Sequence, residues 1–139
     1  MENCVIFFPV DNGDMTLIKT KSNVTFMIDC NIRNVENDEN IYDCNEYLQK
    51  NLPKDNEQPY LDAFLLTHSD NDHCRGISEY FNLCDPKKVD TSKIRIDELY
   101  VPARLMVDDE HYNDDADAIK KETKRRLDLI GTDEETISG

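Results

Sequence analysis

Two histidines and two aspartates lie within six consecutive residues, His68-Ser69-Asp70-Asn71-Asp72-His73. Imidazole nitrogens and carboxylate oxygens both bind divalent cations, at about 2.0–2.2 Å. Two such cations about 3.5–4 Å apart form a hydrolytic centre, in which the metals activate water and no separate nucleophilic side chain is needed. The spacing therefore makes His68, Asp70, Asp72 and His73 the candidate metal ligands of this chain.

The segments on either side of this cluster predict how it is positioned. Residues 61–67 form a near-continuous apolar run, which indicates a strand covered on both faces. A loop that leaves a rigid strand at His68 can aim alternate side chains at a small volume. Gly76 follows the loop, and residues 77–84 then show a short helical pattern that ends at Asp85-Pro86.

The first third of the chain predicts an antiparallel meander. Three segments rich in β-branched and aromatic residues are separated by strong turn signals, and tight turns join neighbouring antiparallel strands. The strands are expected at residues 3–10, 15–20 and 24–30, and the turns at 11–14 and 21–23. A polar loop is expected next, followed by a helix over residues 41–52, where apolar residues recur at three- and four-residue spacing.

Two further elements are expected near the carboxyl end. Residues 94–101 alternate between apolar and polar, as a strand does, and residues 114–130 carry an apolar stripe at helical spacing. Acidic residues crowd the start of this helix and basic residues its later turns, which complements the helix dipole. Residues 131–139 form a polar tail with no strand signal, so we expect the last helix to end without a partner strand.

Composition limits the classes of function. The net charge of −14 opposes capture of a phosphate backbone, so direct nucleic-acid binding by this chain alone is not expected. The five cysteines are odd in number and irregularly spaced, which argues against a disulfide framework. No basic leader precedes the first apolar segment, and no apolar run approaches the roughly 20 residues of a membrane span. We therefore expect a cytoplasmic protein with no membrane partner.

Residues 64–76, Phe-Leu-Leu-Thr-His-Ser-Asp-Asn-Asp-His-Cys-Arg-Gly, resemble the first metal motif of the metallo-β-lactamase superfamily. Residues 13–18 resemble the family's glycine-aspartate strand entry, and residues 27–30 its "LIDCG" strand. The resemblance covers residues 4–101 in element order. It implies an α/β (α+β) fold in which residues 1–130 form the amino-terminal half of a four-layer αββα sandwich, with one of its two β-sheets.

The resemblance also implies roles for the loop residues. His68 and Asp70 would bind the first metal, and Asp72 and His73 the second, with Asp72 as the candidate catalytic carboxylate. The commoner family form has histidine where this chain has Asp70, and the form here is similar to the branch with the hydrolase domain of the DNA-uptake channel. Because an oxygen ligand makes the first site harder, the two divalent ions are expected to be zinc or manganese. Asp29 would at most support the metal ligands without binding the metal itself.

Four ligands are fewer than two metals need, and the family takes the others from later loops. After His73 the only histidine is His111, which lies in an acidic segment and is expected to be an exposed loop residue. We therefore expect the chain to stop before the rest of its site. Cys74 is either a soft ligand, a redox-sensitive thiol or, most simply, a partly buried small residue.

Two functions from different classes follow. The first is a binuclear metallohydrolase that uses a metal-bound hydroxide on a phosphodiester or other ester-like bond, with this chain alone a poor or inactive enzyme. The alternative is a partial or degenerate domain that acts as a metal-binding or protein-interaction module. The expected partner is the missing carboxyl-terminal half of the domain or a separate protein. The residues that bind substrate are not identifiable from the sequence.

Overall fold

A computed structural model of the chain describes residues 2–36, 38–83 and 85–130. Its mixed sheet has the strand order β1-β2-β3-β6, and both β5 and β7 pair with β6. The strands are β1 (Cys4–Phe7), β2 (Thr16–Lys19), β3 (Thr25–Ile28), β4 (Cys30–Asn31), β5 (Lys54–Asp55), β6 (Gln58–Leu65) and β7 (Arg95–Tyr100). The helices are α1 (Cys44–Asn51), α2 (Asn71–Cys74), α3 (Ile77–Tyr80), the 3₁₀ helix η1 (Pro86–Lys88), α4 (Ala103–Val107) and α5 (Asp114–Ile130). The expected α/β class is confirmed; the expected polar tail lies outside the described residues.

The antiparallel meander is confirmed, because β1 pairs with β2 and β2 with β3 in antiparallel fashion. The expected tight turn between β1 and β2 is wrong. The connection spans residues 8–15 and is closed by a hydrogen bond from the amide of Phe8 to the carbonyl of Met15, at 3.0 Å. Asp11 and Gly13 both have positive φ, 59° and 102°, within this longer connection.

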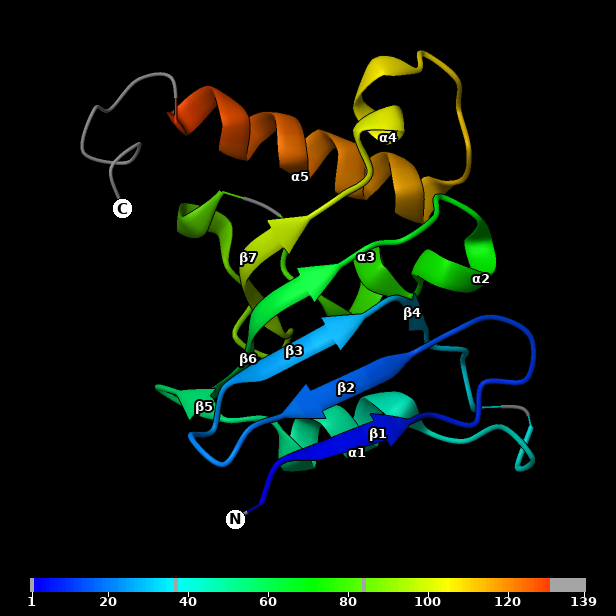
Figure 1. Ribbon diagram of the computed structural model, residues 1–139, viewed down its shortest axis with the longest axis vertical. Helices are drawn as coiled ribbons and strands as arrows, with labels where there is room; N and C mark the ends of the chain where they lie inside the picture. Colours follow the sequence, from blue (N-terminus) through cyan, green and yellow to red (C-terminus); the bar gives the residue numbers. More distant parts are fainter. Residues whose placement is uncertain (1, 37, 84, 131–139) are drawn as a thin grey trace.

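Strand β6 lies at the centre of the sheet and pairs in parallel with both β3 and β7. The expected cover on both faces is not found in the described residues, because Ala63 and Leu65 are only partly buried. Leu61 and Phe64 are fully buried. The strand was expected at 61–67 and is found at 58–65. Since β3, β6 and β7 are parallel, their carboxyl ends meet at one edge of the sheet (Figure 1).

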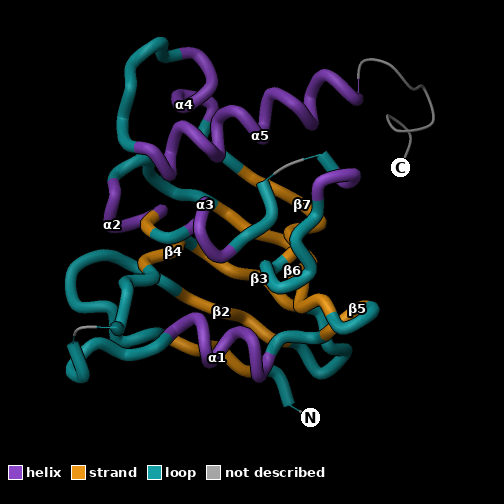
Figure 2. The backbone as a smooth tube through the Cα atoms, turned by 180° about the vertical axis from the view of Figure 1, so that it is seen from behind, coloured by secondary structure: helices purple, strands orange, loops and turns teal. Residues whose placement is uncertain are grey.

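Helices cover one face of the sheet. Successive side chains of a strand point to opposite faces, and one cross-strand row consists of Ile6, Leu17, Met27, Phe64 and Leu99. The three central members of this row are fully buried in the core, together with residues of α1 and α3. Figure 2, which views the sheet from behind, shows α1 and α3 in front of the strands.

The opposite face of the sheet is apolar and open. One cross-strand row is Val5, Ile18, Phe26, Ala63 and Glu98, and the next is Phe7, Thr16, Ile28, Leu65 and Tyr100. The face is therefore mainly apolar, with the carboxylate of Glu98 on β7. Phe7 is 78 % exposed, and Val5 and Tyr100 are about half exposed. In Figure 1, which looks onto this face, no helix crosses in front of the strands. The described residues therefore form two layers, a sheet and its helices.

Helix α5 spans Asp114–Ile130, close to the expected residues 114–130. Its buried residues Ala116 and Ile119 join the core, and it contacts α2 and α3. Near its end, Arg126 donates to the carbonyls of Ile96 and Asp97, at 2.8 and 3.1 Å, which satisfies acceptors of the edge strand. In the part of the chain that the structure describes, no helix is long and apolar enough to cross a membrane.

Candidate metal centre

The predicted metal-binding segment begins at the carboxyl end of β6. His68 lies three residues after Leu65, the last residue of the strand, as the sequence predicted. The second half of the segment was expected to be a loop, and this is wrong, because Asn71–Cys74 form the short helix α2. The turn closes when the amide of His73 donates to the carbonyl of Asp70, at 2.9 Å.

Asp29 is the centre of the hydrogen bonds at this edge. It follows β3, is 1 % exposed and has a φ of 57°, a conformation that aspartate and asparagine adopt more readily than most residues. Its Oδ1 accepts from the amide of Thr67 at 2.7 Å, and its Oδ2 accepts from the Thr67 hydroxyl. Oδ2 also accepts from Nδ1 of His73 at 2.8 Å. One buried carboxylate thus ties together the end of β3, the end of β6 and α2.

This network fixes the tautomers of both histidines. The carboxylate oxygen accepts this hydrogen bond, so in the neutral imidazole Nδ1 of His73 carries the proton and Nε2 has a free lone pair. The Thr67 hydroxyl donates its single hydrogen to Asp29, so its oxygen accepts from Nδ1 of His68, at 3.0 Å. Nε2 of His68 is therefore also free. A histidine whose other nitrogen donates to a carboxylate is the usual arrangement of a metal ligand.

The two imidazoles lie side by side, with ring centroids 5.0 Å apart. Nε2 of His73 is 3.8 Å from Oδ1 of Asp72, too far for a hydrogen bond. Partial burial lowers the pKa of His73, but the hydrogen bond and charge of Asp29, with the charges of Asp72 and Asp14, outweigh it, so that the pKa is raised. The site is therefore an electronegative one that attracts cations.

A second loop closes the site from the side of β2. Among the described residues, Asp14, Asp29 and His73 form a group whose potential ligand atoms all lie within 4.8 Å of one another. The loop approaches so closely that a Cβ atom on Gly13 would overlap the carbonyl oxygen of Asp72. Each residue of the glycine-aspartate pair therefore has a role here. Gly13 allows the loop to approach Asp72, and Asp14 adds an exposed carboxylate to the site.

The four residues predicted as ligands are not brought into one tight group. His73 is close to the ring of His68 and to the carboxylate of Asp72. Asp70 is exposed, and its side chain forms no capping bond with α2. Only His73 belongs to the tight group with Asp14 and Asp29. Asp72, the predicted catalytic carboxylate, is partly exposed beside Nε2 of His73.

Two residues left open by the sequence have structural partners. His111 is exposed and its Nδ1 pairs with Oδ2 of Asp117, in agreement with the expected loop residue. The thiol of Cys74 is buried, where it donates to the carbonyl of Asp70 at 3.3 Å and to Oδ1 of Asn113 at 3.4 Å. Burial and the charge of Asp115 raise the pKa of Cys74 to about 12, so the thiol is protonated at neutral pH, not a soft thiolate ligand.

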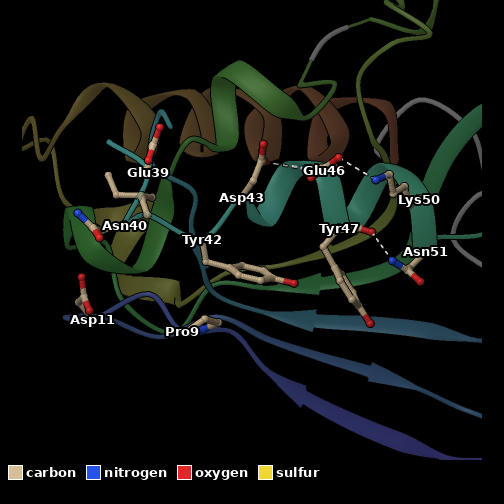
Figure 3. Close-up of a pocket in the computed structure, with 11 residues that line it drawn as sticks. Pro9, Asp11, Glu39, Asn40, Tyr42, Asp43, Glu46, Tyr47, Lys50 and Asn51 are labelled. Carbon is tan, nitrogen blue, oxygen red and sulfur yellow. Dashed lines mark hydrogen bonds and ion pairs between the residues drawn. The ribbon is translucent and has the colours of Figure 1, made fainter. Parts of the chain in front are cut away.

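A hollow of about 680 Å³ beside α1 contains none of the predicted ligands (Figure 3). Three of its four acidic residues, Asp11, Asp43 and Glu46, have partners within the chain. Asp43 accepts from the amide of Glu46 and caps α1, and Glu46 pairs with Lys50 at 2.7 Å. Asp11 pairs with Arg33 at 2.5 Å. These contacts give the lining a structural role and leave the cluster at the sheet edge as the candidate site.

Comparison of the chain with protein-family models, with curated proteins and with solved structures found no match.

Proposed function

We propose that this chain holds the metal-binding edge of a metal-dependent hydrolase that acts on a phosphodiester or another ester-like bond. The observation that supports this most is the hydrogen-bond chain from Asp29, which leaves Nε2 free on both His68 and His73. These rings are 5.0 Å apart at the carboxyl ends of parallel strands. Open α/β sheets place their ligand sites at that edge.

The donor set fits zinc or manganese. Imidazole nitrogens from His68 and His73 and a carboxylate oxygen from Asp72 suit either ion, and harder oxygen ligands favour manganese. The predicted ligand Asp70 would have to turn toward this volume to add a second carboxylate. A divalent ion in this position supplies activated water and stabilises the negative charge that develops on the substrate. The chain's own contribution is to orient the imidazoles through Asp29 and Thr67. The exposed Asp14 offers one more carboxylate from the opposite loop.

The open face of the sheet supports the finer architecture, a four-layer αββα sandwich of the metallo-β-lactamase type. Phe7, Val5 and Tyr100 are about half exposed or more on a face whose other residues are mostly apolar, with Thr16 and Glu98 as polar members. A contiguous apolar surface of this kind normally packs against another element. We propose that a second sheet, about 10 Å away, covers it and supplies the remaining ligands.

The alternative, a non-catalytic metal-binding module, is favoured by a different observation. The tight group of Asp14, Asp29 and His73 offers three ligand atoms in one volume, enough for a single ion. However, Asp29 already accepts three hydrogen bonds from protein donors, which makes it a support for the ligands more than a ligand itself.

Calorimetric titration with Mn²⁺ and with Zn²⁺ separates these functions. We expect weak binding by the wild-type chain, and weaker binding by His68→Ala, Asp72→Ala and His73→Ala. His111→Ala and Asp109→Ala are matched controls of the same chemical type and should bind like the wild type. Equal binding by all variants would show that the loop is not the site. A strong effect of Asp14→Ala with no effect of His68→Ala would favour the single-ion module.

Hydrolysis of bis(p-nitrophenyl) phosphate with added Mn²⁺ tests the reaction itself. We expect slow or undetectable turnover by the 139-residue chain, because ligands misplaced by about 1 Å cost on the order of a hundredfold in rate. Any activity should be lost in Asp72→Ala. Robust metal-dependent turnover that survives this substitution would contradict the proposed role of the loop.

A further inference from the structure

The start of α5 holds the first half of the metal-binding segment. Asn113, the residue before α5, donates from Nδ2 to the carbonyl of Ser69 at 2.8 Å. Its Oδ1 accepts from the amide of Ala116 at 2.8 Å, so the same side chain also caps the helix. The thiol of Cys74 donates to that oxygen as well, at 3.4 Å. One amide group thus connects α5 to the segment before and after Asp72.

The first turn of α5 holds the other end of the segment. Both oxygens of Asp115 are used: Oδ2 accepts from the amide of Gly76 at 3.1 Å, and Oδ1 accepts from the amide and the hydroxyl of Ser78 at 3.0 and 2.5 Å. Gly76 has a φ of 86°, and a Cβ atom there would lie 2.8 Å from the carbonyl of Ile32. The backbone at Gly76, where the segment ends, is therefore held between Ile32, which follows β4, and Asp115 of α5.

We propose that Asn113 and Asp115 are positioning residues for the metal centre. This inference rests on the proposed function. They fix the backbone at Ser69 and at Gly76, and the imidazole of His73 and the carboxylate of Asp72 project from the residues between these points. Release of either point lets α2 rotate away from Asp29, which lengthens the 2.8 Å bond that orients His73.

The capping role of Asn113 must be separated from its role in the segment. Asn113→Ser does this, because serine caps a helix about as well as asparagine and carries no charge. It has no Nδ2 to donate to Ser69. We expect a melting temperature close to that of the wild type and Mn²⁺ affinity about tenfold weaker, the lower end of the effect of removing groups that support metal ligands.

Asp115→Asn is the second variant. It keeps one oxygen and loses the other acceptor, so Gly76 and Ser78 are no longer both held. Asp114→Asn is the control, since Asp114 is the exposed neighbour and the change in charge is the same. We expect about tenfold weaker Mn²⁺ binding by Asp115→Asn and wild-type binding by Asp114→Asn. Asp43→Ala removes the cap of α1 and should lower the melting temperature without changing Mn²⁺ affinity.

The titrations give decisive outcomes. Weaker Mn²⁺ binding by both Asn113→Ser and Asp115→Asn, with melting temperatures near that of the wild type, supports the inference. Wild-type affinity in both variants, while His73→Ala binds weakly, overturns it and leaves the proposed function standing. Absence of Mn²⁺ binding by the wild-type chain, or unchanged binding by His73→Ala, overturns the proposed function and this inference together.

Discussion

The carboxylate of Asp29 determines which ring nitrogen of each neutral histidine is available to bind a cation. Oδ2 of Asp29 accepts from two donors, one on Thr67 and one on His73, and the proton positions follow from that count. The motif itself was visible in the sequence, because its residues are adjacent. The bond between Asp29 and His73 spans 44 positions, so only the fold brings it about, and the pattern of residues gave no separate signal for Thr67.

Asp29→Asn tests this carboxylate without straining the backbone, because asparagine also adopts positive φ. The amide nitrogen it introduces cannot accept from either donor. We expect Mn²⁺ affinity to fall by about 10- to 100-fold and the free energy of unfolding by about 1.5–3 kcal/mol. Asp62→Asn is the control: Asp62 accepts from the amide and hydroxyl of Thr25, away from the site. It should lose stability and keep its metal affinity, as measured by urea denaturation and calorimetry.

Gly13→Ala tests the approach of the second loop. At a φ of 102°, with a Cβ that overlaps the carbonyl of Asp72, the loop must move. The expected loss is about 1–3 kcal/mol in the free energy of unfolding. Urea denaturation measures it, with Asn12→Ala as the exposed neighbour that should stay near the wild type. An alanine variant as stable as the wild type would mean that the loop is not packed on the metal-binding segment.

Elements with a local signature were predictable, and elements built by long-range contacts were not. Helix α5 was predicted at about residues 114–130 and is found there, because its acidic first turn and its apolar stripe are local features of the sequence. Strand β5 has two exposed residues and exists only as the partner of β6, so nothing in its sequence indicates it. The segment around α2 is held by hydrogen bonds to Asn113 and Asp115, 44 and 39 positions later, which a local pattern does not reveal.

Glu122 makes the stability of α5 dependent on pH. Burial raises its pKa, but the hydrogen bonds from Arg125 and Arg126 outweigh this, and the pKa is lowered. A lowered pKa means stability that is present above the unfolded value of about 4.3 and lost as the pH falls through the folded value. We expect Glu122→Gln to be less stable at pH 7 by about 1.5–3 kcal/mol. The difference should shrink below about pH 4, as measured by urea denaturation at several pH values. A difference that stays constant with pH would contradict this role.

Across the described residues, helices cover one face of the sheet and leave the other face open. The sequence predicted the strands by their apolar residues, but it did not indicate which face of the sheet the helices cover. The helices α1 and α3 settle this for the row that contains Met27. The open rows keep Phe7 and Tyr100 in contact with solvent.

Phe7→Ser tests whether the open face is a binding surface. Because Phe7 is 78 % exposed, the free energy of unfolding should change by less than about 1 kcal/mol. We expect weaker binding of the dye ANS and less self-association in sedimentation. Val107→Ser is the control, since Val107 is 76 % exposed but lies on α4, away from this face. Equal dye binding by the wild type and both variants would show that the face does not act as an apolar surface.

The location of a bound ion tests the central claim most directly. Anomalous diffraction from crystals grown with Mn²⁺ should show a peak about 2.0–2.2 Å from Nε2 of His73, with an oxygen of Asp72 in the same coordination sphere. Nε2 of His68 should face the same volume. A peak at another place on the chain, or no peak near residues 68–73 at saturating Mn²⁺, would contradict the account.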